Sequence, residues 1–517
     1  MSLFNSSDKQ KFNKEISVDS ALGRGVTSVE RAKQELFFKP ERVDPIDYIK
    51  NDKNNYYGQN HFTQKPYYVN DDEVTHEILV GSTGTGKGVL IGNRVYEAIN
   101  KNKGVIIIDP KQDAFLPQIC KEALKKQGRP QDFQVVSFPN NFGYSGVNEF
   151  DNYKEIANKF IVMLELEPSD NPGIDYYRKN SRVALRKILK IFFDGSLGVL
   201  VKKDFQDILI HIRFLKEDLE KAELLQKEFS KPKPNANLIA KFSKRYYDTS
   251  KIDAQYWETT DVATLDSLSK SLAEVSEAAD IFSKYTLEGA LYQNKVLYVK
   301  VDMLDIASLK LTKLLITDAI IQSKRKKANT IIIADELSFY ANTTISGALA
   351  TVRSMGLKFI LALQDLAQIE DGLREAILSN CNLKLFYKIS DKFTLEWIEK
   401  IGGKELISKY SKKDNETSIV QDTEDNLNTT RIRALPRAGT AIVIAEADNT
   451  PVIIDTNYIG VSQEFDWQKY DDKKSNDLFE IDKKYKKENY EVFIKEKKEL
   501  LKDSDLFAFE FDSLEIK

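Results

Sequence analysis

One glycine-rich run constrains this chain more than any other feature of its sequence. Residues 78–88 read ILVGSTGTGKG, which satisfies the pattern G-x-x-x-x-G-K between an apolar segment and a segment with helical spacing of apolar residues. Glycines let the backbone fold tightly, so that successive N–H groups point at a phosphate, and the start of the following helix adds partial positive charge. A chance glycine loop would lack these flanks. The pattern predicts a site for the phosphates of ATP, formed by Gly81, Ser82, Thr83, Gly84, Thr85, Gly86, Lys87 and Gly88.

One position departs from the usual form of this loop. The residue after the lysine is normally Ser or Thr, whose hydroxyl binds Mg²⁺, and here it is Gly88. We therefore expect Mg²⁺ to depend on the nucleotide, on water and on an acidic residue elsewhere, or on a neighbouring hydroxyl such as that of Thr85. Lys87 is expected to supply a mobile cation for the β- and γ-phosphates.

Short apolar runs, bounded by polar or glycine residues, alternate with amphipathic segments. Runs such as residues 105–108, 331–334 and 359–363 are typical of strands buried on both faces of a parallel sheet. Between about residues 151 and 289 such runs vanish and long amphipathic segments replace them. We therefore predict an α/β core with a mainly parallel sheet, interrupted by an all-helical inserted domain. The expected divisions are a polar N-terminal arm or appendage (1–65), the first part of the nucleotide-binding domain (66–150), the all-helical domain (151–289), the second part of the nucleotide-binding domain (290–460) and a charged C-terminal tail (461–517).

Two of the predicted strands end in aspartate, at Asp109 and at Asp335. An acid at the carboxyl end of a strand beside the loop can hold Mg²⁺. Of the two, only Asp335 is followed by a second carboxylate, Glu336, which can polarise an attacking water. Asp109 is followed by Pro110 and Lys111, which cannot serve as a base. We therefore assign Asp335 to magnesium and Glu336 to catalysis, the alternative being an acidic pair that caps the next helix.

The next predicted strand ends at Gln364, which a parallel sheet would place near the same edge. An amide can donate to a phosphate and accept from water, so Gln364 could report hydrolysis to the helix that follows. Taken alone, Gln364 is better explained by a structural capping role.

Composition excludes several classes of protein. Lys and Arg total 76 against 79 Asp and Glu, so the chain carries no uniformly basic coat for nucleic acid, and any DNA contact must come from local patches. Two cysteines, Cys120 and Cys381, cannot make a disulfide scaffold, and three histidines leave little for a zinc site. The sequence contains no run of about 18 apolar residues, so we expect no transmembrane helix.

Eight segments, in order, resemble the type IV secretion coupling proteins, the conjugative DNA-transfer ATPases of the TraG type. The resemblance runs from about residue 78 to residue 454, and the GKG form of the loop is itself similar to one branch of that family. The segments are GSTGTGKGV (81–89), GVIIIDPK (104–111), DYYRKNSRVAL (175–185), IIIADE (331–336), ALATVRSMGL (348–357), QDL (364–366), ILSNCNLKLF (377–386) and LPRAGTAIVI (435–444).

The resemblance implies a RecA-like P-loop NTPase core that carries an all-helical domain, assembles as a homo-hexameric ring, hydrolyses ATP and moves single-stranded DNA. By position, Lys87 is the loop lysine, Asp335 and Glu336 are the acid pair, and Gln364 is the phosphate-sensing glutamine. Arg353 falls where the family places an arginine finger donated to the neighbouring subunit. A guanidinium in that role is worth about 10³–10⁵ in rate.

The resemblance also implies partners: relaxase and relaxosome proteins, the ATPases of a type IV secretion channel, and inner-membrane components. Coupling proteins usually carry transmembrane helices ahead of the nucleotide-binding domain, and this sequence has no such segment. We therefore expect a cytoplasmic protein, held peripherally at the inner membrane through its partners.

Two other functions fit the same residues. One is a ring motor of the FtsK/HerA type, which translocates double-stranded DNA. The other is a receptor platform that binds ATP for assembly and docks protein substrates without pumping DNA. The helical insertion favours a coupling protein over the first, and Glu336 counts against a purely static role.

Overall fold

The structure is a computed structural model. It describes residues 42–138, 144, 146, 147, 151–193, 262–276, 287–413, 416–425, 427, 429–435, 438–446 and 450–470. Two stretches of the expected all-helical domain, residues 194–261 and 277–286, lie outside the described residues. So do most of the expected N-terminal arm and of the charged tail.

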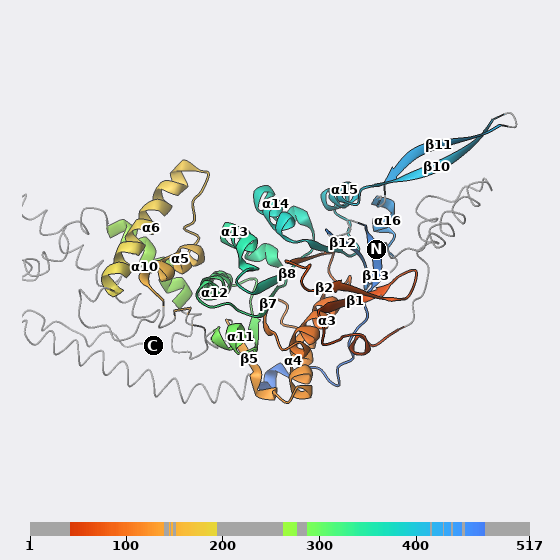
Figure 1. Ribbon diagram of the computed structural model, residues 1–517. Coiled ribbons are helices and arrows are strands. Elements are labelled where there is room, and N and C mark those ends of the chain that lie inside the picture. Colours follow the sequence, from red (N-terminus) through yellow and green to blue (C-terminus); the bar gives the residue numbers. More distant parts are fainter. Residues whose placement is uncertain are drawn as a thin grey trace, which may run out of the picture.

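A single large sheet of eleven strands runs through the described core (Figure 1). Its order is β2-β1-β13-β12-β9-β3-β8-β7-β4-β6-β5. The seven strands from β9 to β5 are parallel to one another, whereas β12, β13, β1 and β2 extend the sheet with antiparallel pairings. The mainly parallel α/β sheet predicted from the sequence is confirmed. The strands are β1 (Asn54–Asn60), β2 (Pro66–Asn70), β3 (Glu77–Val80), β4 (Gly104–Asp109), β5 (Phe133–Ser137), β6 (Val296–Lys300), β7 (Thr330–Ala334), β8 (Leu357–Leu363), β9 (Leu383–Phe386), β12 (Thr440–Ala445) and β13 (Val452–Asp455).

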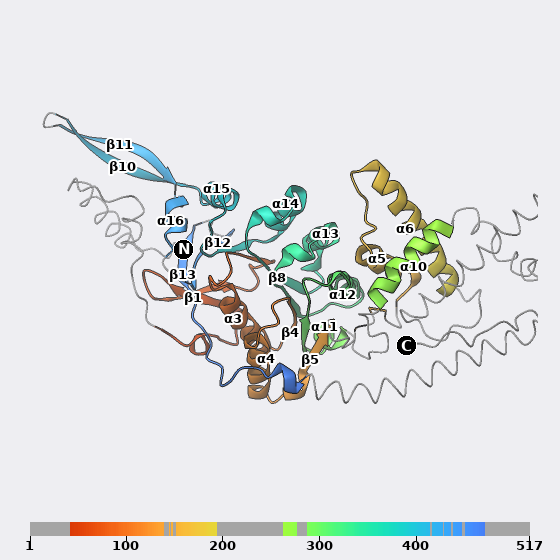
Figure 2. The ribbon, with the colours of Figure 1, turned by 180° about the vertical axis from the view of Figure 1, so that it is seen from behind.

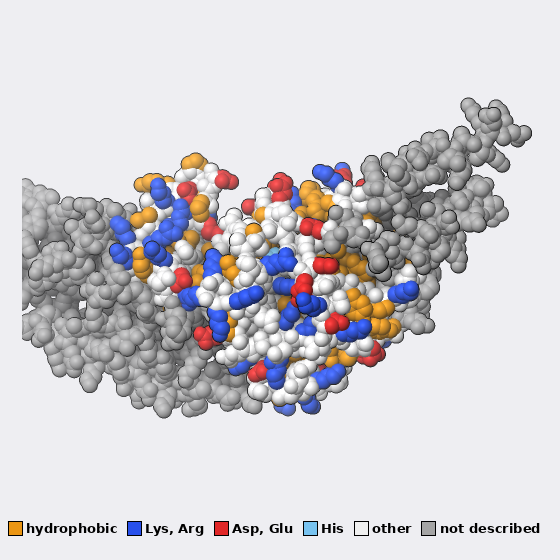
Figure 3. Space-filling view, viewed as in Figure 1, with side chains coloured by type: hydrophobic (Ala, Val, Ile, Leu, Met, Phe, Trp, Pro, Cys, Tyr) orange, Lys and Arg blue, Asp and Glu red, His pale blue; other side chains and the backbone are white. Residues whose placement is uncertain are grey.

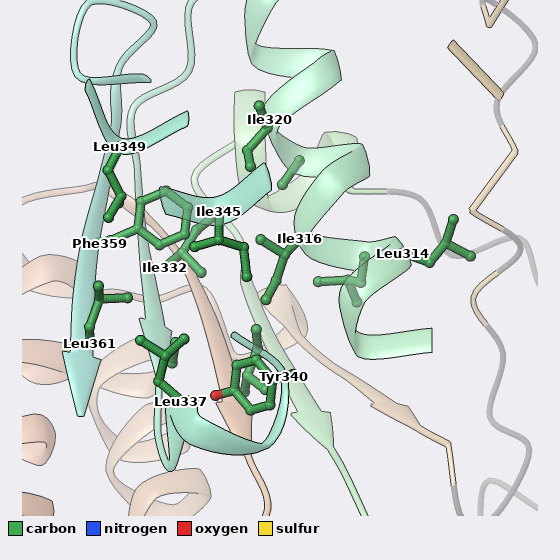
Figure 4. Packing of buried hydrophobic residues seen from close by; sticks show 14 of the residues in the cluster. Leu314, Ile316, Ile320, Ile332, Leu337, Tyr340, Ile345, Leu349, Phe359 and Leu361 are labelled. Atoms are coloured by element: carbon green, nitrogen blue, oxygen red, sulfur yellow. The ribbon is translucent and has the colours of Figure 1, made fainter. Parts of the chain in front are cut away.

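Alternate residues of the central strands enter two different hydrophobic clusters, one on each face of the sheet. In β7, Ile332 and Ala334 belong to one cluster, and Ile331 and Ile333 to the other. Because successive side chains of a strand point to opposite faces, a strand buried on both must be apolar throughout. Figure 4 shows the first cluster, where Ile332 of β7 meets side chains of neighbouring elements.

Helices cover both faces of the sheet, which gives a three-layer core. One face packs against α3 (Lys87–Asn100) and α4 (Phe115–Lys126), whose buried residues share a cluster with β1 and β2. The other face contributes to the cluster that contains the apolar sides of α12, α13, α14 and α15. The helices on that face are α12 (Ile306–Arg325), α13 (Thr343–Val352), α14 (Asp371–Asn380) and α15 (Lys392–Ile401). Two short helices are α11 (Glu288–Tyr292) and α16 (Thr429–Arg433).

Between residues 151 and 292, helices are the only regular elements that the described residues contain. Helices α5 (Tyr153–Met163), α6 (Pro172–Phe193) and α10 (Val262–Ser276) pack together at one end of the core, next to α12 (Figures 1 and 2). At the other end of the core, the hairpin of β10 (Lys404–Lys413) and β11 (Glu416–Asp425) projects away from the sheet.

The chain ends of the described region differ from the expected arm and tail. Strand β1 lies inside the expected arm of residues 1–65, yet it pairs with β13 as part of the core sheet. Its side chains Tyr56 and Tyr57 are fully buried there. Residues 461–470 lie inside the expected charged tail, yet Trp467 donates its indole N–H to the Asp113 carbonyl at 2.9 Å and packs against the Phe465 ring at a tilted angle. None of the helices in the described ranges is long and apolar enough to cross a bilayer.

Candidate nucleotide-binding site

The glycine loop connects β3 to α3, as the sequence predicts, and several distant segments hold its shape. The Gly81 N–H donates to the Leu363 carbonyl at 3.1 Å, and the Ser82 N–H donates to the Lys388 carbonyl at 3.3 Å. The Thr85 hydroxyl donates to the Ser82 carbonyl at 2.7 Å, which closes the loop on itself. This bond uses only the hydrogen of the Thr85 hydroxyl and leaves the lone pairs of its oxygen, so Thr85 still fits as a replacement for the metal-binding hydroxyl missing at Gly88.

The start of helix α3 has the features of an anion site. Its N-cap is Gly86, which has φ of +114° and supplies no side chain to accept from the first N–H groups of the helix. Such N–H groups and the helix dipole favour a phosphate at this end. The Lys87 ammonium lies folded back into the loop, donating to the Gly81 carbonyl, and the side chain is buried. Burial, followed by the nearby Lys111 ammonium, lowers the pKa of Lys87.

The carboxylate pair, Asp335 and Glu336, follows the last residue of β7. Both side chains are buried, with 4% and 2% of each residue exposed. Glu336 has φ of +50° and ψ of +48°, a left-handed conformation that costs a non-glycine residue about 1–2 kcal/mol. Tyr340 donates its hydroxyl to the main-chain carbonyl of Asp335 and so braces this turn, and Figure 4 shows its ring packed beneath the end of the strand. A strained acid held by its surroundings is typical of functional sites.

The structure adds one residue that sequence reasoning dismissed. The Lys111 ammonium lies 2.8 Å from Asp335 Oδ2 and 2.9 Å from Glu336 Oε1, so it bridges both members of the carboxylate pair. Burial would lower the pKa of Lys111, but the two carboxylates outweigh it and hold that pKa above its ordinary value. The signal was present in the sequence, since Lys111 follows strand β4 by two residues. What the sequence did not show is that β4 lies next to β7.

Gln364 was predicted to act at this site and Arg353 at the site of a neighbouring subunit, and the structure places the two at opposite edges of the sheet. Gln364, directly after β8, donates its amide to Glu336 Oε2 at 3.3 Å and therefore joins the carboxylate pair. Arg353 caps the end of α13 and is exposed, and its guanidinium donates to the Asp72 carbonyl at 2.6 Å. It lies next to the start of β8, at the edge of the sheet opposite the loop, so it does not reach the site of its own chain.

Asp109 ends the strand beside β7 but takes a structural place. The main-chain N–H of Lys111 donates to Asp109 Oδ1 at 2.8 Å, and the Tyr298 hydroxyl donates to the other oxygen. Burial, followed by the carboxylate of Asp113, raises the pKa of Asp109 to about 6. Asp109 therefore positions the turn that carries Lys111.

The residues present fit a magnesium ion bound chiefly through a nucleotide. Nowhere in the described ranges do three or more His, Cys, Asp and Glu side chains gather as a metal site. Mg²⁺ in nucleotide sites commonly has only one or two protein carboxylates and takes its other ligands from phosphates and water. Asp335 and Glu336 supply such carboxylates, and Glu336 Oε1 accepts no hydrogen bond beyond its ion pair with Lys111.

Comparisons with known proteins agree with this architecture. The model of the family described as type IV secretory system conjugative DNA transfer matches residues 28–165, and the model described as TraM recognition site of TraD and TraG matches residues 329–437. The curated type 4 coupling protein DotL of Legionella pneumophila is 22% identical over 418 residues, which cover 69% of this chain and 53% of DotL. The chain thus spans about half the length of this relative.

Among solved structures, the bacterial conjugative coupling protein TrwBdeltaN70 aligns over 85% of this chain and 94% of its own, at 15% identity and a TM-score of 0.55. The plasmid coupling protein TrwB in complex with ADP and Mg²⁺ aligns over the same shares, at 16% identity and a TM-score of 0.52. The fold and the loop define a RecA-like P-loop protein. Over the ranges that they match, the two family models and DotL make this chain similar to the type IV secretion coupling proteins.

Proposed function

We propose that this protein is an ATPase that recruits a relaxase–DNA substrate to a type IV secretion channel and translocates single-stranded DNA during conjugation. The observation that carries the proposal is the meeting of Lys87, the carboxylate pair and Gln364 at one edge of the sheet, beside the glycine loop. The solved TrwB complexes with ADP and Mg²⁺ and with a non-hydrolysable ATP analogue support ATP and Mg²⁺ as ligands of this chain.

Each residue has a distinct task in this proposal. The loop N–H groups and Lys87 bind the phosphates, and Asp335 holds the magnesium ion that the nucleotide brings. Glu336 orients the attacking water and accepts its proton, which is the work of a general base. Gln364, in contact with Glu336 Oε2, passes the loss of the γ-phosphate to the segment after β8. Arg353 would act on the site of a neighbouring subunit in a homo-hexamer, since its own site lies at the opposite edge.

Helix α6 offers a surface suited to single-stranded DNA. Tyr176, Lys179, Val183, Arg186 and Lys190 follow one another at spacings of three and four residues, and all five are exposed. Tyr177 beside them is 73% exposed and contacts the Tyr176 ring edge-on, with 5.5 Å between ring centroids. Figure 3 shows Lys and Arg side chains gathered over this helix. Exposed aromatic rings among cations provide base stacking and phosphate contacts, worth about 1–3 kcal/mol per stacked base.

The remaining parts of the proposal concern partners and place in the cell. The family model described as TraM recognition site supports a docking role for residues 329–437 toward relaxosome proteins. We further propose that contacts with channel ATPases and inner-membrane components hold the protein at the cytoplasmic side of the inner membrane.

The test is the rate of ATP hydrolysis with and without DNA, for the wild type and for Glu336→Gln. Stimulation by single strands supports the proposal, and stimulation by duplex alone would indicate an FtsK/HerA-like motor. No hydrolysis by the wild type, with or without DNA, would leave an ATP-binding docking platform. Glu336→Gln should bind ATP but not hydrolyse it, because a neutral amide cannot accept the proton.

The α6 surface has its own test. The double variant Tyr176→Ala, Tyr177→Ala should weaken binding of a single-stranded oligonucleotide by tenfold or more, and Lys179→Ala should reduce the salt dependence of that binding. Lys392→Ala is the matched control, because that lysine is 85% exposed on α15, away from α6. Equal losses in all variants would contradict a specific role for α6.

A further inference from the structure

The carboxylate pair carries two negative charges in a buried place, and one flexible cation faces both. Lys111 Nζ lies within 3 Å of an oxygen of each acid, while 36% of the lysine side chain remains exposed. Without a cation, two adjacent buried carboxylates would repel each other. The lysine therefore satisfies the same oxygens that a divalent cation needs.

The main chain on which Lys111 is mounted is fixed, so only its side chain needs to move. Its N–H is held by Asp109, and the next residue, Gln112, has φ of +53° and donates its side-chain amide to the Val301 carbonyl at 3.0 Å. The four-carbon stem with its partly exposed end can swing outward while this turn stays in place. Such a contact can be made and broken without rearranging the sheet.

The glycine loop makes the carboxylates especially important here. Gly88 has no hydroxyl, so the loop offers no side-chain oxygen at the position that usually binds Mg²⁺. Asp335 and Glu336 are thus the chief protein oxygens at this edge for a cation, and Lys111 occupies both. A lysine ammonium and Mg²⁺ cannot both lie within 3 Å of the same oxygens, because the two cations repel each other strongly at that range.

We propose that Lys111 is a reversible counter-ion for the carboxylate pair, which holds Asp335 and Glu336 in position without nucleotide and must leave them before a divalent cation binds. The inference rests on the proposed nucleotide site and concerns its regulation. Lys111 is here a positioning residue that competes with the metal. Its effect on the Mg²⁺ requirement is therefore opposite to that of a lysine that binds phosphate. Competition raises the Mg²⁺ concentration required for binding, whereas a phosphate ligand would lower it.

The first measurement is the Mg²⁺ dependence of binding of a fluorescent, non-hydrolysable ATP analogue. Lys111→Met should lower the half-saturating Mg²⁺ concentration by about tenfold or more, and Lys111→Arg, which keeps the charge, should not lower it. Lys103→Met is the matched control, because Lys103 forms an ion pair with Asp71 at 2.6 Å at the other end of β4. A raised Mg²⁺ requirement in Lys111→Met, or an unchanged one, overturns the proposal.

The second measurement needs no nucleotide, so it separates this proposal from the proposed function. The melting temperature is measured in chelator and then with added Mg²⁺ alone. Lys111→Met and Lys103→Met should both melt below the wild type in chelator, and Mg²⁺ should restore Lys111→Met only. If Mg²⁺ restores neither variant, Lys111 is not a stand-in for the metal. Lys111→Gln, which can still donate to one carboxylate, replaces Lys111→Met in both measurements if the latter does not fold.

Discussion

A buried ion cluster ties helix α5 to helix α12, and removing its central lysine gives a sharp test of how the helical segment is anchored. Lys159 on α5 is fully buried and lies 2.5 Å from Asp151 Oδ2 and 2.5 Å from Asp318 Oδ1. Asp318 belongs to α12, so the lysine joins the two helices. Arg325, at the end of α12, also contacts Asp151 at 2.5 Å. We expect Lys159→Met to loosen α5 from the core.

The size of the effect follows from what the substitution leaves behind. Removing one partner of a buried ion pair costs about 3–5 kcal/mol, because the other charge stays buried. Here each acid keeps one or more further partners: Arg325 for Asp151, and for Asp318 the Tyr144 hydroxyl together with the Gln322 amide at 2.8 Å. The expected loss is therefore at the lower end, about 3 kcal/mol, which corresponds to roughly a hundredfold increase in opening.

Amide hydrogen exchange of the α5 segment measures this opening directly. Lys159→Met should exchange about a hundredfold faster than the wild type there, and adding Asp318→Asn should recover part of the protection, since fewer buried charges remain. Lys154→Met is the control, because Lys154 is exposed on the same helix. An increase of less than about fivefold in Lys159→Met would refute the account of this cluster as the anchor.

Three further predictions concern the site and its support. Gly86→Ala should weaken nucleotide binding more than tenfold, because its Cβ would lie 2.6 Å from the Gly439 nitrogen, whereas Gly88→Ala, with open space, should bind normally in the same titration. Arg353→Ala should abolish ATP turnover in the assembled ring with nucleotide affinity near normal; retained turnover would contradict a finger role. Burial lowers the pKa of His76 to about 4, so its imidazole stays neutral in the folded protein above that pH, whereas in the unfolded chain it takes up a proton below about pH 6.5. The free energy of unfolding should therefore fall by about 3 kcal/mol as the pH drops from 6.5 to 4. A single histidine that titrates near pH 4 by NMR would confirm this.

The parallel strands and the glycine loop could be predicted because their signals are local. β3, β4 and β7 are mostly apolar and are buried along their whole length, since helices cover both faces, and β3 leads directly into the glycine pattern. Strand β1 escaped prediction because its buried polar residues depend on distant partners. Asn55, for example, donates its amide to Asp71 Oδ1 at 2.9 Å, and the Tyr56 N–H donates to Glu97 Oε1 at 3.1 Å. In sequence such a segment looks like a polar loop.

The site was predicted only in part, for a reason of strand order. The acid pair and Gln364 follow strands β7 and β8, and the expectation that they meet at one edge needed only that the sheet be parallel. The contribution of Lys111 needed the further fact that β4 lies beside β7, with Ile108 opposite Ala334. Periodicity reveals which segments are strands but not which of them are neighbours, so a residue on an adjacent strand end is easily overlooked.

The antiparallel end of the sheet also shapes the loop, which the sequence gives no reason to expect. The Gly439 N–H, just before β12, donates to the Thr85 carbonyl at 2.8 Å, and the Thr456 N–H and hydroxyl both donate to the Gly439 carbonyl at 2.7 Å. Leu363 and Lys388 hold the first half of the loop in the same way. Three segments remote in sequence thus fix a loop of eight residues. A glycine motif can therefore be recognised on its own, but it acquires its phosphate-binding shape only when β12 and β13 complete the sheet beside it.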